Sequence, residues 1–131
     1  MLQVDFEAQA ARRQLDKVLA SAGFSRNERL SRFLRFVVEQ RLEGRNQELK
    51  ESLIAIEVFG RPPGYDSKQD PIVRTEASRL RARLSEYYLA QGKDDPVVIE
   101  LPRSSYIPVV RSAERTDKVT APERARMRWE L

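Results

Sequence analysis

The residues with the clearest capacity for chemistry are the arginines of segment 71–83, which alternate with small side chains. Against these four arginines the segment holds a single acid, Glu76. A guanidinium donates in a fork that fits a phosphate or the major-groove edge of guanine, and small neighbours let a helix approach such a surface closely. This pattern is typical of a helix that binds a nucleic acid. The arginines are Arg74, Arg79, Arg81 and Arg83, and the small residues are Thr75, Ser78 and Ala82.

A helix over about 71–90 would gather these residues on one side. Its apolar residues recur at helical spacing and mark the side that faces a core. The small residues and Arg79 then point away from the core. Arg74 and Arg81 flank them on one side, and Arg83 lies on the other. The apolar residues of this helix are Val73, Ala77, Leu80, Leu84, Tyr87 and Tyr88.

Composition restricts the remaining classes of function. The 131 residues include 24 Lys plus Arg against 20 Asp plus Glu, a net charge of +4, with no His and no Cys. Thiolate catalysis, disulfides, Cys-ligated zinc and an unperturbed side chain titrating near neutrality are therefore absent. We expect no enzymatic activity, no metal and no cofactor. Apolar runs such as 107–110 are far too short to span a membrane, so we expect a soluble, cytoplasmic protein.

Three amphipathic helices are predicted before the arginine-rich one. Each carries apolar residues at spacings of three and four. The first ends near Gly23. Ser25 and Glu28 form a capping box that starts the second, which ends at Gly44. The predicted spans are 6–23, about 26–43 and 49–58.

The fourth helix has a strong start at Asp70 and Pro71. The carboxylate could accept hydrogen bonds from the first free N–H groups, and Pro suits the first helical position. Beyond the helix, apolar residues predict a strand over 97–101, a turn at 102–105 and a second strand over 106–110. Because Pro108 cannot donate to a ladder, we expect the second strand at a sheet edge.

These elements predict a mainly α fold with a small β-hairpin. Three helices followed by a hairpin describe a winged helix-turn-helix, here preceded by an extra N-terminal helix. The helix before the hairpin is then the recognition helix, and the hairpin is the wing. We divide the chain into an extra helix (1–24), a winged-helix DNA-binding domain (25–111) and a charged tail (112–131) with a short helix over 122–131.

Several motifs resemble those of the OmpR-type winged-helix effector domain of bacterial response regulators. The chain is still more similar to the N-terminal winged-helix domains of large bacterial signalling proteins that carry TPR repeats or cyclase domains. The resemblance covers about residues 8–110, and its specific part is 70–88. For the OmpR type the matching segments are RFLRFV at 32–37, VFG at 58–60, RLRARL at 79–84, IEL at 99–101 and Tyr106. For the signalling proteins they are ERLSRFL at 28–34, VFGR at 58–61, DPIVR at 70–74 and Tyr87-Tyr88.

The resemblance implies a DNA-binding regulator and also a partner. In OmpR-type domains the loop corresponding to 61–70 touches RNA polymerase, and Arg61, Tyr65 and Lys68 are the exposed candidates here. An ordinary solvated loop is the alternative. The chain departs from the family pattern by starting with a helix instead of a small sheet, and by Ser104-Ser105 where a Gly tends to precede the wing Tyr. No receiver domain fits, so control by aspartyl phosphorylation is not implied.

We therefore expect a sequence-specific regulator of transcription that binds double-stranded DNA. Two alternatives stay open. The arginine-rich face could be a solvated surface held by the pairs Glu76 to Arg79 and Arg83 to Glu86. The winged helix could also be a protein-interaction module for an acidic partner or another subunit. The expected DNA contacts are Arg74, Thr75, Ser78, Arg79 and Ala82 in the major groove, Arg81 and Arg83 on phosphates, and Arg103 in the minor groove.

A second copy of the chain is a further expected partner. One module of this type buries only about 600 to 1,000 Å² on DNA, which is little for selecting one genomic site. A homodimer or tandem array, paired through the first helix or through the tail with Met127, Trp129 and Leu131, would enlarge the contact. The alternative is that the first helix covers its own domain's core and the tail is a linker.

Overall fold

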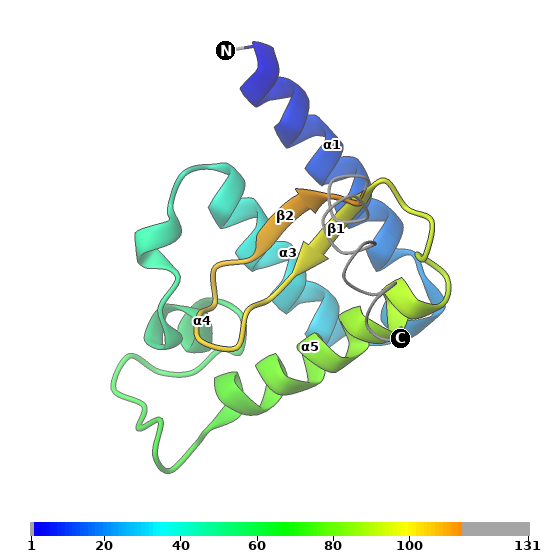
Figure 1. Cartoon of the computed structure of the whole chain (residues 1–131). Helices are drawn as coiled ribbons and strands as arrows, with labels where there is room; N and C mark the ends of the chain where they lie inside the picture. Colours follow the sequence, from blue (N-terminus) through cyan, green and yellow to red (C-terminus); the bar gives the residue numbers. More distant parts are fainter. Residues whose placement is uncertain (1, 114–131) are drawn as a thin grey trace, which may run out of the picture.

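Helices account for most of residues 2–113, the part of the chain that the computed structural model describes (Figure 1). The predicted fold class is confirmed: three helices, α3 to α5, precede a two-stranded antiparallel hairpin. The predicted helix over 122–131 lies outside the described residues. No helix in the described range has both the length and the apolar character needed to cross a membrane. The elements are α1 (Leu2–Leu19), α2 (Ala22–Ser25), α3 (Glu28–Leu42), the 3₁₀ helix η1 (Asn46–Glu48), α4 (Glu51–Glu57), α5 (Ile72–Leu89), β1 (Val97–Glu100) and β2 (Val109–Ser112).

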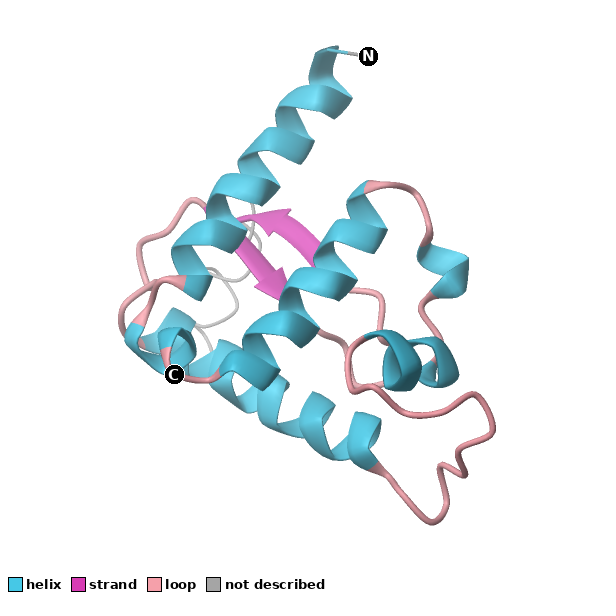
Figure 2. Cartoon of the chain, turned by 180° about the vertical axis from the view of Figure 1, so that it is seen from behind, coloured by secondary structure: helices cyan, strands magenta, loops and turns pink. Residues whose placement is uncertain are grey.

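The hydrophobic core lies where α3, α5 and the hairpin meet. Phe33 of α3 and Leu80 of α5 are both 0% exposed, and Ile99 of β1 belongs to the same cluster. Phe59, just after α4, meets Phe33 edge to face with ring centroids 5.4 Å apart. Leu15 brings α1 into this core, and both views place α1 and α3 on one side of the hairpin (Figure 2).

The N-terminal region differs from the prediction, and its first helix begins at Leu2 instead of near residue 6. α1 ends at Leu19 and Ser21 precedes the separate α2, so Gly23 lies inside a helical turn. The Ser25 capping box is wrong, because Ser25 closes α2 by donating its N–H to the Ser21 carbonyl at 2.8 Å. Asn27 caps α3 instead, and its side-chain oxygen accepts from the Leu30 N–H at 3.0 Å.

The start of α5 also differs from the predicted Asp70 cap. Pro71 occupies the N-cap position and makes no side-chain hydrogen bond. The Asp70 carboxylate accepts from Arg61 Nε at 2.6 Å instead. A charged donor binds a carboxylate more strongly than a neutral backbone N–H does, so the ion pair outcompetes the cap. It joins the two ends of the loop 61–70.

The hairpin has a different register from the predicted one. β2 begins at Val109 and runs to Ser112, with Val110 opposite Ile99. Pro108 is buried before the strand starts, and it has no N–H to give to a ladder. The Ile107 N–H donates at 2.9 Å to the Ser105 hydroxyl instead. The residues predicted to open the second strand therefore belong to the wing loop.

A polar network fixes α1 to the end of α5 and to β1. Gln14, 2% exposed, donates to Asp95 at 2.8 Å and to the Tyr88 hydroxyl at 3.2 Å. Tyr87 also donates to Asp95, and the Tyr88 hydroxyl accepts from the Ile99 N–H at 2.9 Å. Buried polar groups are costly unless bonded, so these contacts specify how α1 sits on the domain.

Candidate nucleic-acid interface

The predicted reading face of α5, made of Thr75, Ser78, Arg79 and Ala82, lies on the outside of the molecule. All four residues are exposed, and the Arg79 side chain keeps 65% of its surface accessible. The helical period therefore assigned the two sides of α5 correctly. The opposite side buries Val73, Ala77, Leu80, Leu84 and Tyr87.

Glu76 is a charged residue of α5 that the structure buries. Its exposed fraction is 3%, and its Oε2 accepts from Arg79 NH1 at 3.0 Å and from Arg29 NH1 of α3 at 3.5 Å. The pair with Arg79 was predicted as a surface contact, whereas Arg29 was not predicted. A buried carboxylate requires such partners. Glu76 therefore restrains the guanidinium of Arg79, although most of that side chain is exposed to solvent.

Arg74 flanks the reading face and connects α5 to α4 and to the loop before α5. Its NH1 donates to the Glu51 carboxylate at 3.2 and 3.4 Å, and its NH2 donates to the Ser67 carbonyl at 3.1 Å. Its side chain is 52% exposed. Arg74 thus holds the first turn of α5 against α4 while part of its guanidinium stays open to solvent.

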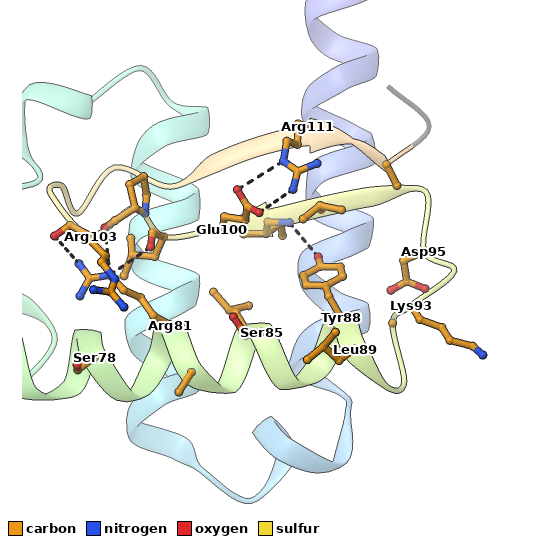
Figure 3. A pocket seen from close by; sticks show the side chains of 18 residues that line it. Ser78, Arg81, Ser85, Tyr88, Leu89, Lys93, Asp95, Glu100, Arg103 and Arg111 are labelled. Carbon is orange, nitrogen blue, oxygen red and sulfur yellow. Dashed lines mark hydrogen bonds and ion pairs between the residues drawn. The ribbon is translucent and has the colours of Figure 1, made fainter. Parts of the chain in front are cut away.

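Arg81 connects the reading face to the wing loop. Its Nε donates to the carbonyls of Leu101 and Pro102 at 3.2 and 3.0 Å, and its NH2 donates to the Arg103 carbonyl at 3.4 Å. Figure 3 shows Arg81 reaching from α5 to this loop, with Arg103 and Ser78 nearby. The side chain of Arg103 is exposed. Arg81 therefore positions Arg103 relative to α5.

A groove of about 1110 Å³ separates α5 from the hairpin (Figure 3). Ser78, Arg81 and Arg103 line one end, and Lys93 and Asp95 line the other. Leu89, which is 83% exposed, also lines the groove. The end beside the reading face thus offers hydroxyl and guanidinium donors.

Arg83 lies on the other side of α5, as predicted, and faces α2. Its NH1 donates to the Gly23 carbonyl, and its Nε lies 3.8 Å from Glu86. A Cβ at Gly23 would come within 3.0 Å of Arg83 Cδ. Arg83 therefore packs against the α2 backbone and holds that turn to α5.

The loop 61–70 exposes less than was predicted. Lys68 is exposed, but Arg61 is half-buried by its ion pair with Asp70. Tyr65 packs against the core cluster, and its burial raises the pKa of the phenol, with a further contribution from Glu51. Of the three residues expected to present a surface, only Lys68 is fully on the outside.

Two arginines of α3 join the candidate interface without having been predicted there. Arg29 and Arg32 are exposed near the start of α3, and Arg29 meets α5 through Glu76. Both arginines lie off the buried face of α3, and the way α3 crosses α5 decides what they approach. A signal for the contact was available, since Glu76 lies three residues after Val73 and four before Leu80, within the buried stripe.

Acidic side chains are the metal ligands that residues 2–113 could offer, since the chain has no His and no Cys. No group of three or more acidic side chains in that range could hold a metal ion. Comparison of the chain with protein-family models, curated proteins and solved structures finds no significant match. The fold is a winged helix by its order of elements, with an exposed face on the helix before the wing.

Proposed function

We propose that this protein is a sequence-specific, double-stranded DNA-binding regulator of transcription without enzymatic activity. The observation that carries the proposal is the exposed face of α5. There, Arg79 is surrounded by small residues, and the loop of the wing lies beside it. In this function α5 enters the major groove and the wing loop reaches the neighbouring minor groove. Arg103 is the wing residue directed to the minor groove.

The side chains on the exposed face of α5 are suited to binding DNA in size and in hydrogen-bonding groups. Small side chains at positions 75, 78 and 82 let the helix backbone approach base edges, and Arg79 supplies the donors that guanine or phosphate accept. Arg74 and Arg81 keep N–H donors beyond their intramolecular bonds, because a guanidinium carries five. They are therefore suited to the flanking phosphates. The resemblance to bacterial winged-helix domains favours the same function.

A titration with DNA tests this proposal. Fluorescence anisotropy of a labelled duplex of mixed sequence should show binding that weakens by about tenfold or more between 50 and 200 mM salt, because phosphate contacts release counterions. A chain that shows no affinity for duplex DNA at low salt would refute the proposal. A short acidic peptide at equal charge serves as the control ligand.

A protein-interaction module is the second candidate, and a specific observation favours it. Each of the four α5 arginines has an intramolecular partner. Arg74 and Arg79 pair with carboxylates, which offset their charge, and Arg81 and Arg83 donate to backbone carbonyls, which leaves fewer donors for DNA. The exposed Leu89 near the groove adds an apolar contact that DNA does not use. Preferential binding of the acidic peptide over the duplex would support this candidate.

Further partners belong to the same proposal. RNA polymerase would contact the loop 61–70 through Lys68, and the protein would act in the bacterial cytoplasm. A homodimer would enlarge the reading surface, and α1 offers an element outside the minimal fold for the contact. Sedimentation of the full chain and of a version ending at Ala113, with and without duplex, tests this. Ala113 keeps β2 complete, since Ser112 pairs with Val97.

A further inference from the structure

A basic cleft opens beside the reading face, between the start of α3 and the end of α4. Its volume is about 470 Å³, and it is lined by Glu28, Arg29 and Arg32 of α3 and by residues 58–61. Three of the lining residues are arginines and one is an acid. Arg32 is exposed, and no hydrogen bond or ion pair joins it to any other residue that the structure describes.

One buried oxygen connects this cleft with the reading face. Glu76 Oε2 accepts from Arg29 at 3.5 Å on the cleft side and from Arg79 at 3.0 Å on the α5 side. The two guanidinium groups therefore lie next to each other, although they come from different helices. The cleft lined by Arg29 and Arg32 therefore adjoins the face of α5 that carries Arg79.

The donors of the cleft suit an anion with several oxygens. Arg29 uses only NH1 in its pair with Glu76. Arg61 uses Nε for Asp70 and NH1 for the Phe59 carbonyl. Since each guanidinium has five N–H donors, Arg29 and Arg61 keep donors in addition to the whole Arg32 fork. Phosphate oxygens accept such forks in pairs.

We propose that this cleft holds a phosphate of the DNA backbone, with Arg32 as the principal donor and Arg29 as the second. The inference rests on the proposed function, because the phosphate belongs to the duplex that α5 reads. It adds a contact from α3 to those of the recognition helix and the wing. Binding to DNA then joins α3 and α5 across the strand.

The test compares Arg32→Ala with Arg35→Ala in the full chain. Arg35 is on the same helix and is also exposed, but it pairs with Glu39 at 3.8 Å and does not line the cleft. Each variant removes one positive charge, so the overall charge is matched. Affinity for a labelled mixed-sequence duplex is measured over a salt series, and thermal melting confirms that both variants are folded.

Each phosphate contact contributes about 0.9 to the slope of log affinity against log salt. We expect Arg32→Ala to lower the steepness by about that amount and to weaken binding severalfold at low salt, whereas Arg35→Ala keeps the wild-type slope. Arg32→Lys retains the charge but not the fork, so it should keep the slope and bind more weakly. This variant gives a second test should Arg32→Ala fold poorly.

The outcomes separate this inference from the proposed function. Steep salt dependence in the wild type, with equal slopes for Arg32→Ala and Arg35→Ala, would overturn the phosphate site and leave the DNA-binding function standing. A wild-type chain that fails to bind the duplex would overturn both. If Arg32→Ala impairs binding of polyglutamate but not of the duplex, the cleft serves an acidic protein and the phosphate site is refuted.

Discussion

The buried carboxylate of Glu76 holds the exposed guanidinium of Arg79, three residues further along α5, at 3.0 Å. Glu76 is 3% exposed, whereas 65% of the Arg79 side chain is accessible. A charge that far from water is stable only with charged partners. Arg79 therefore stabilises the fold and also belongs to the proposed reading face. Because the ion pair already restrains its side chain, less conformational freedom is lost on binding.

Arg79→Ala should lower both stability and DNA affinity. The variant leaves Glu76 with Arg29 alone, so we expect the free energy of unfolding to fall by roughly 1 to 3 kcal/mol. Adding Glu76→Gln removes the buried charge and should recover part of this loss, with a coupling energy of about 0.5 to 3 kcal/mol in urea unfolding.

DNA binding separates the two roles of Arg79. The double variant should remain as defective in duplex binding as Arg79→Ala, although it is more stable. Recovery of DNA affinity together with stability would mean that Arg79 acts only through the fold. Additive effects of the two substitutions on stability would show that the ion pair contributes nothing.

Truncation of the core should be costly at Phe33 of α3 and at Leu80 of α5, which are both fully buried. Phe33→Ala and Leu80→Ala should lower the free energy of unfolding by about 3 to 5 and 2 to 5 kcal/mol, because each leaves a cavity. Thr75→Ala, on the exposed side of α5, should stay within about 0.5 kcal/mol. Chemical denaturation measures all three, and a mild effect of Leu80→Ala would contradict the assigned face of α5.

Stability should depend on pH through Asp95. Burial raises its pKa, but hydrogen bonds from Tyr87 and Gln14 and the Lys17 ammonium at 3.7 Å outweigh burial, so the pKa lies below the ordinary 3.8. A lowered pKa contributes stability that is present above pH 3.8 and is lost as pH falls through the folded-state value. Asp95→Asn should destabilise the protein at neutral pH by about 1 to 3 kcal/mol and should flatten the acid limb of the melting profile.

Stability at alkaline pH should depend on Tyr87, and it should fall as pH rises instead of as pH falls, which gives an independent check of the same network. Burial, followed by the hydrogen bond to Asp95, raises the pKa of Tyr87 above the ordinary 10.0. The contribution of Tyr87 to the free energy of unfolding is therefore fully present below pH 10 and is lost as pH rises through the pKa of Tyr87 in the folded protein. Tyr87→Phe should remove that alkaline loss, and an unchanged alkaline limb in this variant would contradict the network.

Arg81 and Arg103 should separate stability from binding in the wing. Arg81→Ala frees the carbonyls of Leu101 and Pro102, so we expect a loss of roughly 1 to 3 kcal/mol and faster hydrogen exchange in the wing. Arg103→Ala keeps the backbone carbonyl that Arg81 uses, so it should preserve stability while weakening DNA binding. Equal destabilisation by the two variants would show that Arg81 does not position the wing.

The two long amphipathic helices of the domain, α3 and α5, could be predicted directly from the sequence. α3 and α5 begin and end close to the predicted residues, because their buried stripes are continuous and Gly44, with φ 79°, suits the end of α3. The outward side of α5 followed from the same period. This side contains the residues on which the proposed function depends.

Features set by distant partners did not follow from the sequence. Asp70 has the local signal of a helix cap, but Arg61 nine residues earlier takes its carboxylate. The register of β2 is decided by its pairing with β1 and by Pro108. The approach of Arg29 to Glu76 depends on how α3 crosses α5. In each case a tertiary contact outweighs the local preference.

Selection from a pool of randomised duplexes tests the central claim most directly. The wild-type chain should enrich a short motif, and Arg79→Ala combined with Glu76→Gln should lose that motif while retaining salt-sensitive binding to any duplex. This result would place sequence reading on the outward face of α5. Enrichment of the same motif by wild type and variant, or of none by the wild type, would contradict the account.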